Sequence, residues 1–348
     1  MKVIIASTIV PFVRGGGTFI VDWLEEMLVR YGHQVETFRI PFHSSFPEML
    51  DQMLALRLLD VTESADRLIA IRTPSYLMRH PNKVLWFIHH HRTAYDLWGT
   101  KYQEIPNTPQ GLRYRDAIHS ADNLAFSEAR SIFTNSKVVS ARVKKFNGFD
   151  SEVLYPPLMR PESYRHDAYG DYILYVSRLV SHKRQHLAIK AMQYTRSRVR
   201  LVVAGTPDGG PRDPYLDELR CLITHHDLDD RVTLMTDWIS EEEKIRLFAG
   251  CLASVYIPFD EDSYGYSSLE AHHARKAVIT TKDSGGPLEL IVNGENGFIV
   301  DPEPKALARA MDRLYEDRKL GGRMGEAGLR RIDKLGINWD HTIAKLLA

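Results

Sequence analysis

Short apolar stretches rich in valine and isoleucine alternate with stretches of helical periodicity along the whole chain. In the first half we predict strands at residues 3–7, 34–38, 67–71, 84–89, 132–136 and 152–156. The second half repeats the pattern, with predicted strands at 172–177, 200–205, 231–236, 253–258, 277–281 and 297–300. Strands that alternate with helices are typical of βαβ units, which build a parallel sheet covered on both faces. The pattern therefore predicts an α/β fold with two doubly wound sheets.

One segment between the two halves breaks both periodicities. Residues 155–171, YPPLMRPESYRHDAYGD, carry prolines, a glycine and charges that are typical of a linker. We therefore predict an N-terminal Rossmann-like domain at 1–160, a C-terminal one at 161–334, and a C-terminal helix at 335–348. Ligands of such sheets bind beyond the carboxyl ends of the strands, so we expect functional residues at the strand-to-helix junctions.

Composition excludes several classes of partner. Lysine plus arginine and aspartate plus glutamate both number 45, so no overall charge favours nucleic acid or an anionic bilayer. The two cysteines, Cys221 and Cys251, predict neither a disulfide framework nor a thiolate metal site. No apolar stretch approaches the ~18 residues that span a bilayer, and a proline and glycines follow the first apolar stretch where a signal peptide would continue. We predict a cytoplasmic protein.

Three cations stand at one junction of the second half. Arg178 ends the strand at 172–177, and Lys183 and Arg184 open the helix that follows. A guanidinium and an ammonium beside a helix N-terminus suit a diphosphate, because they can neutralise the charge that develops on a departing phosphate. A solvated basic turn is the structural alternative.

A second junction carries two acids and a glycine. Asp262, Gly265 and Glu270 form a D-x-x-G-x-x-x-x-E pattern after the strand at 253–258. Glu270 is predicted inside a helix that begins near Gly265, whereas Asp262 lies in the loop before it. The two acids can therefore contact different parts of one ligand. The next junction, SGGPLE, adds a glycine pair and Glu289.

The first strand is followed by a glycine-rich loop. Gly15, Gly16 and Gly17 would let backbone N–H groups approach an anion at the start of a helix. Glu36 lies at the distance that a nicotinamide dinucleotide site requires, but Ile20 occupies the place of its third glycine. A tight turn without a ligand is the other alternative.

Three consecutive histidines end the strand at 84–89. Alternation along a strand would place His89 and His91 on one side and His90 on the other, so we do not expect all three to bind one metal ion. The loop that follows carries Arg92, Tyr95, Asp96 and Trp98, a mixture able to contact a sugar acceptor.

The ordered set of motifs resembles family 4 of the retaining, nucleotide-sugar-dependent glycosyltransferases, the glycosyl transferases group 1, which have the GT-B fold. The second half matches through SRLVSHK, DSYGYSSLEA, SGGPLE and NGENGFIV. The first half matches through GGGTFIVDWLEEMLVRYGHQV, the histidine-rich strand end and FTNSKVVSARV. The resemblance covers nearly the whole chain, and the ordered set is specific although each motif alone is weak.

The resemblance implies a role for each residue of the second half. Arg178 and Lys183 would hold the donor diphosphate, Glu270 would bond the ribose, and Asp262 would contact hydroxyls of the transferred sugar. Backbone amides around the segment Tyr264, Gly265 and Tyr266 would cradle the phosphate and the sugar.

In the first half the resemblance places a histidine toward the donor sugar, with His89 as the best match and His91 as the second candidate. Two departures from the family pattern bear on the choice of sugar. Asp262 replaces the usual glutamate, and Tyr266 and Ser267 replace a small aliphatic pair.

The resemblance further implies a transfer of a hexose or a related sugar from a UDP or GDP sugar to a hydroxyl acceptor. The acceptor would be a glycan, a lipid-linked sugar or a small molecule, as in polysaccharide or glycoconjugate biosynthesis. We expect no metal cofactor, because the cations take its place, and no nucleic acid partner. A nucleotide-sugar epimerase of the same fold and a non-catalytic sugar-nucleotide-binding protein are the alternatives.

A basic segment at residues 137–145 leaves two interpretations open. Lys137, Arg142, Lys144 and Lys145 lie among apolar valines, which could seat this edge weakly on the inner face of the cytoplasmic membrane. A solvated face of an ordinary helix is the interpretation that we favour, because four cations are few for lipid recognition.

Overall fold

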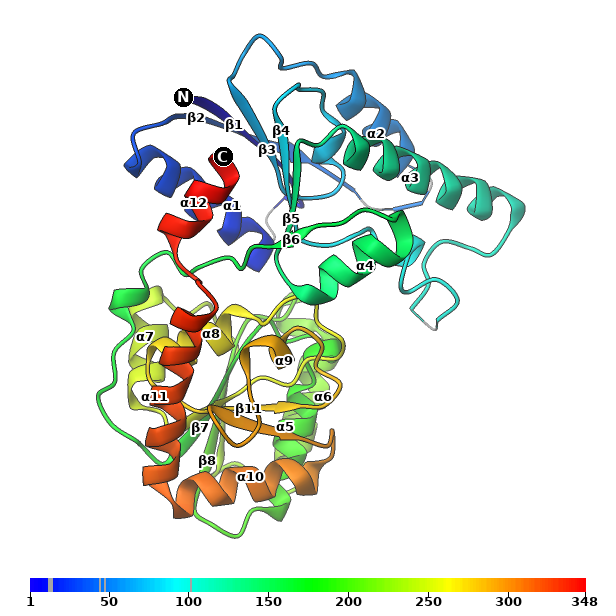
Figure 1. Cartoon of the computed structure of the whole chain (residues 1–348). Coiled ribbons are helices and arrows are strands. Elements are labelled where there is room, and N and C mark those ends of the chain that lie inside the picture. The colour runs from blue at the N-terminus through cyan, green and yellow to red at the C-terminus, as the bar shows by residue number, and fades with distance from the viewer. Residues whose placement is uncertain (12–14, 44, 47, 101) are drawn as a thin grey trace. The chain divides into compact units, whose positions relative to one another are not determined.

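The computed structural model describes residues 1–11, 15–43, 45–46, 48–100 and 102–348 (Figure 1). By their contacts, these residues form two compact units. The N-terminal unit consists of Met1–Pro157 and Ile337–Ala348, and the C-terminal unit of Leu158–Gly336. The chain thus passes from one unit to the other inside the segment predicted as a linker, and its last residues return to the N-terminal unit.

The N-terminal unit is built on a parallel sheet with the strand order β2-β1-β3-β4-β5-β6. Its strands are β1 (Lys2–Ile9), β2 (Gln34–Pro41), β3 (Arg67–Ala70), β4 (Lys83–Phe87), β5 (Ser131–Thr134) and β6 (Glu152–Val153). The order reverses between β1 and β3, which are hydrogen-bonded neighbours. This reversal is the place where a doubly wound sheet offers a ligand crevice.

The C-terminal unit has a second parallel sheet with the order β12-β11-β10-β7-β8-β9. Its strands are β7 (Tyr172–Val176), β8 (Arg200–Ala204), β9 (Val232–Met235), β10 (Ala253–Val255), β11 (Val278–Thr281) and β12 (Gly297–Val300). Counted within the unit, this is the order of a dinucleotide-binding sheet, and the reversal lies between β7 and β10.

Every predicted strand is present, and the α/β fold class is confirmed. The largest differences lie at strand ends. β4 stops at Phe87 and β10 stops at Val255, whereas apolar residues had extended both predictions further. These residues remain buried after the ladder ends, because the chain continues through the interior above the sheet. Apolar composition therefore marks burial better than it marks the end of strand pairing.

Helices cover both faces of the N-terminal sheet (Figure 1). On one face, α1 (Gly16–Arg30) and α12 (Trp339–Leu347) pack their apolar side chains on β1 and β4. Trp339 meets Trp86 edge to face with ring centroids 6.5 Å apart, and Arg67 donates to the carbonyl of Leu346. The predicted helix at 335–348 therefore packs on this unit. The other face carries α2 (Met49–Leu58), α3 (Pro109–Ser127) and α4 (Lys137–Asn147).

The C-terminal sheet is covered in the same way (Figure 1). Its helices are α5 (Gln185–Ala191), α6 (Pro214–His225), α7 (Glu241–Gly250), α8 (Tyr266–His273), α9 (Pro287–Leu290), α10 (Pro304–Glu316) and α11 (Arg318–Lys334). Apolar side chains of α5, α6 and α10 pack against β7 and β8 in one buried core.

A buried carboxyl group interrupts the apolar core of the N-terminal unit. Asp122 on α3 is 1% exposed and accepts hydrogen bonds from Tyr76 (2.8 Å) and Tyr95 (2.6 Å). Burial raises the pKa of Asp122 to about 7, although the two tyrosine donors act in the opposite direction. A carboxyl group whose pKa is higher in the folded state binds its proton more tightly there, so its protonation favours folding.

This pKa shift predicts how stability depends on pH. The contribution of the protonated carboxyl is complete below the ordinary pKa near 3.8 and is lost as the pH rises through about 7. We expect Asp122→Asn, which stays neutral, to unfold at a higher urea concentration than the wild type at pH 8. The advantage should shrink at pH 5, and an equal advantage at both pH values would contradict the assignment.

Candidate functional site in the C-terminal unit

The two predicted junctions meet at the reversal point of the C-terminal sheet. The segment 177–184 follows β7 and the segment 256–265 follows β10, and these two strands are neighbours in the sheet. Because both strands are parallel, their carboxyl ends open at the same edge. The fold therefore brings together the cations of one junction and the acids of the other.

Arg178 lies just beyond the end of β7. Its guanidinium pairs with Asp208 (Nη1 to Oδ2, 2.6 Å), and its side chain is 39% exposed. The backbone at this position is fixed by Gln185, which donates to the Arg178 carbonyl (2.7 Å) and to the Ser177 hydroxyl (2.7 Å). The base of this side chain is thus fixed while its charged end stays accessible to a ligand.

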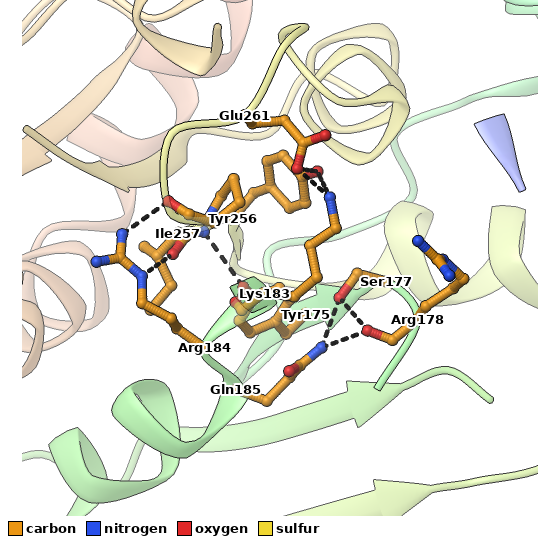
Figure 2. A network of polar contacts seen from close by, with 10 residues as sticks. Tyr175, Ser177, Arg178, Lys183, Arg184, Gln185, Tyr256, Ile257 and Glu261 are labelled. Carbon is orange, nitrogen blue, oxygen red and sulfur yellow. Dashed lines mark hydrogen bonds and ion pairs between the residues drawn. The ribbon is translucent and has the colours of Figure 1, made fainter. Parts of the chain in front are cut away.

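Lys183 is more enclosed than Arg178. It ends a short 3-10 helix (Ser181–Lys183), and its side chain is 10% exposed. The ammonium donates to the Tyr256 hydroxyl (2.9 Å) and forms an ion pair with Glu261 on the loop after β10. Figure 2 shows the extended lysine side chain reaching from the β7 side to this loop. The junctions after β7 and β10 are therefore joined through Lys183.

Arg184 serves a structural purpose. Its guanidinium donates to the carbonyl groups of Ile257 and Pro258 (both 2.7 Å) and binds Asp283 through two nitrogens (2.8 and 2.9 Å). In Figure 2 it turns away from Lys183 toward Ile257. Of the three cations at the predicted junction, this one ties the ends of β10 and β11 together. Arg184 was not among the residues predicted to hold the diphosphate, and its contacts give it a structural role.

Glycines allow the loop after β10 to lie close against its neighbours. Gly265 has φ +72°, and a Cβ atom there would stand 2.2 Å from the Tyr256 ring. A Cβ on Gly285, φ +73°, would stand 2.5 Å from the Glu261 carbonyl oxygen. The Gly286 N–H donates to that carbonyl (2.8 Å). The glycine pair predicted as a ligand loop thus positions the acidic loop by direct backbone contact.

Glu270 is a buried carboxylate with two donors on one oxygen. Its side chain is 4% exposed, and Oε1 accepts from Lys244 Nζ (2.7 Å) and from the Tyr164 hydroxyl (3.0 Å). Lys244 also pairs with Glu241 (2.9 Å). Burial lowers the pKa of Lys244, but the carboxylates of Glu270 and Glu241 outweigh it, so this pKa lies above its usual value. Lys244 is therefore held as a cation beside Glu270.

The end of the acidic loop and the first turn of α8 contain further polar groups. Tyr264 is 1% exposed, and burial raises the pKa of Tyr266 well above its usual value. The hydroxyl groups of Ser267 and Ser268 are buried and have no hydrogen-bond partner among the described residues. Because Gly265 is the N-cap of α8, the backbone N–H groups of this turn lie at its N-terminus, where anions are favoured.

Three residues of this site were missed by the sequence analysis. Glu261 stands one position before Asp262, the acid that the family pattern selects, and its own signal is only the acidic cluster DED. Lys244 and Tyr164 come from α7 and from the linker, so no local motif connects them with Glu270.

In the N-terminal unit, the glycine loop stands at the start of α1. Gly15 is the N-cap, and Gly16 and Gly17 lie in the first turn rather than in a loop. A Cβ on Gly17 would stand 3.4 Å from Nε of Arg72, which follows β3. The Arg72 guanidinium donates to the Thr8 carbonyl (2.8 Å), and its buried Nε has no partner among the described residues. The glycines and this arginine lie at the reversal point of the N-terminal sheet.

The histidines do not follow strand alternation. Because β4 ends at Phe87, they lie in the chain beyond it, and His90 and His91 are both buried whereas His89 is half-buried. His90 Nε2 is 2.8 Å from Asn147 Oδ1. Burial lowers the pKa of both His90 and His91 to about 4, so they are neutral at physiological pH. The alternation argument was wrong, because the strand is shorter than its apolar pattern.

The loop after the histidines is less open than predicted. Tyr95 is 2% exposed and is bonded to Asp122, so it belongs to the core and not to an acceptor surface. Arg92 binds Asp96 through two nitrogens (2.9 and 2.7 Å). Trp98 lies under the guanidinium of Arg115, 4.9 Å from its ring centroid. The prediction that Tyr95 contacts a sugar acceptor is therefore wrong.

The basic segment at 137–145 forms α4. Val139 and Val143 face the core, and Lys144 pairs with Asp150 (2.8 Å) at the surface. Among the residues that the structure describes, no helix has the length and apolar character that crossing a bilayer requires. Within the same residues, no three histidine, cysteine, aspartate or glutamate side chains stand close enough to bind a metal ion.

Comparison with known protein families decides the class of the C-terminal unit. Residues 161–331 match the family model described as glycosyl transferases group 1. The C-terminal unit is a glycosyl transferases group 1 domain. The match includes every residue of the site just described that follows β7 or β10, together with Tyr164 and Lys244. The family resemblance inferred from the motifs is therefore confirmed.

The curated relatives of this chain are partial matches. The human alpha-1,3/1,6-mannosyltransferase ALG2 is 28% identical over 243 residues, which are 63% of this chain and 58% of the human protein. The Staphylococcus aureus capsular polysaccharide biosynthesis glycosyltransferase CapM is 29% identical and covers 46% of this chain and 40% of its own length. The chain thus spans less than two thirds of the length of these relatives.

Solved structures match the whole chain and so establish its fold. Anabaena HepE in complex with UDP and glucose covers 100% of this chain and 99% of its own, at 20% identity and a TM-score of 0.72. The match to sucrose-phosphate synthase from Thermosynechococcus elongatus covers 99% of this chain and 97% of the synthase chain, at 16% identity and a TM-score of 0.75. The predicted GT-B fold, with its two parallel sheets, is confirmed.

Proposed function

We propose that the protein is a retaining glycosyltransferase that moves a sugar from a nucleoside diphosphate sugar to a hydroxyl acceptor. One observation carries the proposal: the reversal point of the C-terminal sheet presents two cations, Arg178 and Lys183, opposite an acidic loop and a helix N-terminus. Cations at this place suit a diphosphate, and acids beside them suit sugar hydroxyls. The family match of the same unit supports this reading.

The proposed roles follow from the contacts. Arg178 would bind the diphosphate through its accessible guanidinium, and Lys183 through its enclosed ammonium. Glu270 would accept hydrogen bonds from the ribose, because Lys244 and Tyr164 hold its carboxylate in place. Asp262 would contact the transferred sugar, and the amides of Tyr264, Gly265 and Tyr266 would cradle the phosphate.

In the N-terminal unit, we propose that His89 contacts the donor sugar, because it is the least buried of the three histidines. His91 is less suited to this role, since it is 9% exposed. Gly15, Gly16 and Gly17 would offer backbone N–H groups at the start of α1 to an anionic group of the substrate. The neighbouring Arg72 would add a positive charge there.

Mannose is the transferred sugar that the relatives favour. Several of the curated relatives carry the name mannosyltransferase, and a Mycolicibacterium smegmatis relative is described as GDP-mannose-dependent. The HepE structure, in contrast, contains UDP and glucose. We therefore propose GDP-mannose as the first donor to test, with UDP-glucose as the comparison.

We propose a front-side mechanism that needs no metal ion. The leaving phosphate would take the proton of the acceptor hydroxyl, while Arg178 and Lys183 stabilise the charge that develops on the diphosphate. This stabilisation is the part usually supplied by a divalent cation. We expect turnover to be the same with and without EDTA. Loss of activity in EDTA, restored by Mg²⁺ or Mn²⁺, would contradict the proposal.

The activity is tested by incubating the protein with GDP-mannose or UDP-glucose and measuring the release of nucleoside diphosphate. Release that depends on an added sugar, lipid-linked or small-molecule acceptor, with the anomeric configuration kept, would support transfer. Epimerised sugar, or binding without turnover, would show that the protein has a different function.

We propose a cytoplasmic site of action, with the basic residues of α4 on a solvated face. Cell fractionation with and without high salt would test this, because weak attachment through α4 to the inner face of the membrane would place part of the protein in a membrane fraction that high salt releases.

A further inference from the structure

Both cations of the proposed diphosphate site are paired with carboxylates of the same chain. Arg178 binds Asp208 from the loop after β8, and Lys183 binds Glu261 from the loop after β10. A diphosphate presents two negative groups to two such cations. Each cation is therefore already paired with a carboxylate, which is an anion like the phosphate that the cation would bind. The diphosphate of a donor has to compete with that carboxylate.

The two pairs differ in burial. The side chains of Arg178 and Asp208 are 39% and 48% exposed, so water and salt screen their attraction and the pair contributes little. The side chains of Lys183 and Glu261 are only 10% and 23% exposed. Charges in such a place are screened less, and the contact between them is correspondingly stronger. The competition is therefore concentrated on Glu261.

Glu261 is held in a place from which it reaches Lys183. Its N–H donates to the Ser284 carbonyl (3.0 Å), and its own carbonyl accepts from the Gly286 N–H (2.8 Å). These bonds fix the backbone against the glycine pair, whose missing side chains permit the approach. The carboxylate also lies 3.5 Å from the Tyr256 hydroxyl, which itself accepts from Lys183. Lysine, tyrosine and glutamate thus form one cluster (Figure 2).

We propose that Glu261 is a built-in competitor for the donor diphosphate. It neutralises Lys183 while the site is empty and gives up this contact when a diphosphate arrives. Without a ligand, Glu261 compensates the charge of the enclosed Lys183 ammonium, and free phosphate anions bind to this ammonium only weakly. When the nucleoside diphosphate product is formed, the carboxylate competes for the same ammonium and speeds product release. This inference rests on the proposed function of Lys183 and adds a role for a residue outside the family pattern.

The test compares Glu261→Gln with Asp208→Asn. Glutamine keeps the size of the side chain and removes the charge, so the diphosphate no longer competes with a carboxylate. We expect UDP or GDP, whichever the wild type binds more tightly in calorimetry, to bind E261Q on the order of tenfold more tightly. The D208N variant removes the same charge from the exposed pair, and its affinity should stay within about twofold of the wild type.

The stability of the empty protein gives a second readout. E261Q leaves the Lys183 ammonium without its carboxylate, so its melting temperature without ligand should fall below that of the wild type. Added nucleoside diphosphate should then raise the melting temperature by more than it does in the wild type. If E261Q does not fold, Glu261→Asp, which shortens the side chain by one methylene, should change the melting temperature and its rise with ligand in the same directions by smaller amounts.

The outcomes separate this inference from the proposed function. If the wild type binds neither UDP nor GDP, the proposed function itself is wrong. If the wild type binds and Lys183→Ala does not, but E261Q binds no more tightly than the wild type, Glu261 is not a competitor and the site assignment stands. If E261Q binds the free nucleoside diphosphate normally and binds GDP-mannose or UDP-glucose more weakly, Glu261 contacts the sugar, and the competitor role is refuted.

Discussion

Replacing Lys183 by alanine should lower the turnover number on the order of 10²–10³-fold. The ammonium is the more enclosed of the two cations at the site, so its charge acts on the leaving diphosphate with little screening. The contribution grows as negative charge develops on the departing phosphate, so the loss should appear in kcat and not only in KM. Steady-state kinetics with saturating donor, together with single-turnover measurements, would determine both parameters.

A surface lysine of the same unit provides the matched control. Lys282 is 63% exposed and pairs with Asp301 (2.6 Å), so Lys282→Ala removes the same charge outside the site. Its kinetics should equal those of the wild type. Lys183→Ala also leaves Glu261 without its cation, so circular dichroism and a melting curve must accompany the assay. Near-normal turnover in a folded Lys183→Ala protein would refute the proposed role.

The fold was predictable because its signal is repeated. Each strand carries a short apolar stretch, and the helices between them make parallel pairing the only economical connection. Strand ends were less predictable, as β4 shows. Ile88, directly beyond Phe87, is as apolar as the residues before it and is also buried, so its side chain alone does not reveal where the ladder stops. Whether each histidine lies on one face of the sheet or the other depends on where β4 ends.

The site was predictable where its residues follow one another along the chain. Arg178 and Lys183 lie five positions apart, and Gly265 and Glu270 belong to one motif, so the strand-to-helix pattern places the members of each pair close together. The partners that set their charge come from elsewhere in the chain. Asp208, Glu241, Lys244 and Tyr164 become neighbours of the site only because of the strand order and the return of the linker.

Arg184 illustrates a different difficulty. It stands beside Lys183 in the sequence and has the same charge, yet its left-handed backbone (φ 58°) turns it toward β11. Closeness to Lys183 in the sequence therefore does not show which way the Arg184 side chain points. A residue's neighbours in the chain determine where its backbone lies, whereas its direction depends on acceptors such as Asp283 that a local motif does not contain.

The second large effect is expected for Lys244→Met. Methionine fills a similar volume, but the Glu270 carboxylate, 4% exposed, loses its buried counter-ion. Removing one partner of a buried ion pair destabilises a protein by about 3–5 kcal/mol, because the remaining charge is uncompensated. Tyr164 cannot make up the loss, since its single hydroxyl proton is shared between Glu270 and Glu241. Urea unfolding of the variant beside the wild type would measure the change.

The double variant Lys244→Met with Glu270→Gln decides whether the loss comes from the stranded charge. A neutral amide can accept from Tyr164 without a cation, so we expect the double variant to recover most of the stability that Lys244→Met loses. It should still bind the nucleoside diphosphate more weakly than the wild type, because the amide replaces the carboxylate proposed to hold the ribose. Recovery of stability together with full affinity would mean that Glu270 serves the fold and not the ligand. If stability does not recover, Lys244 acts through packing instead of through its charge.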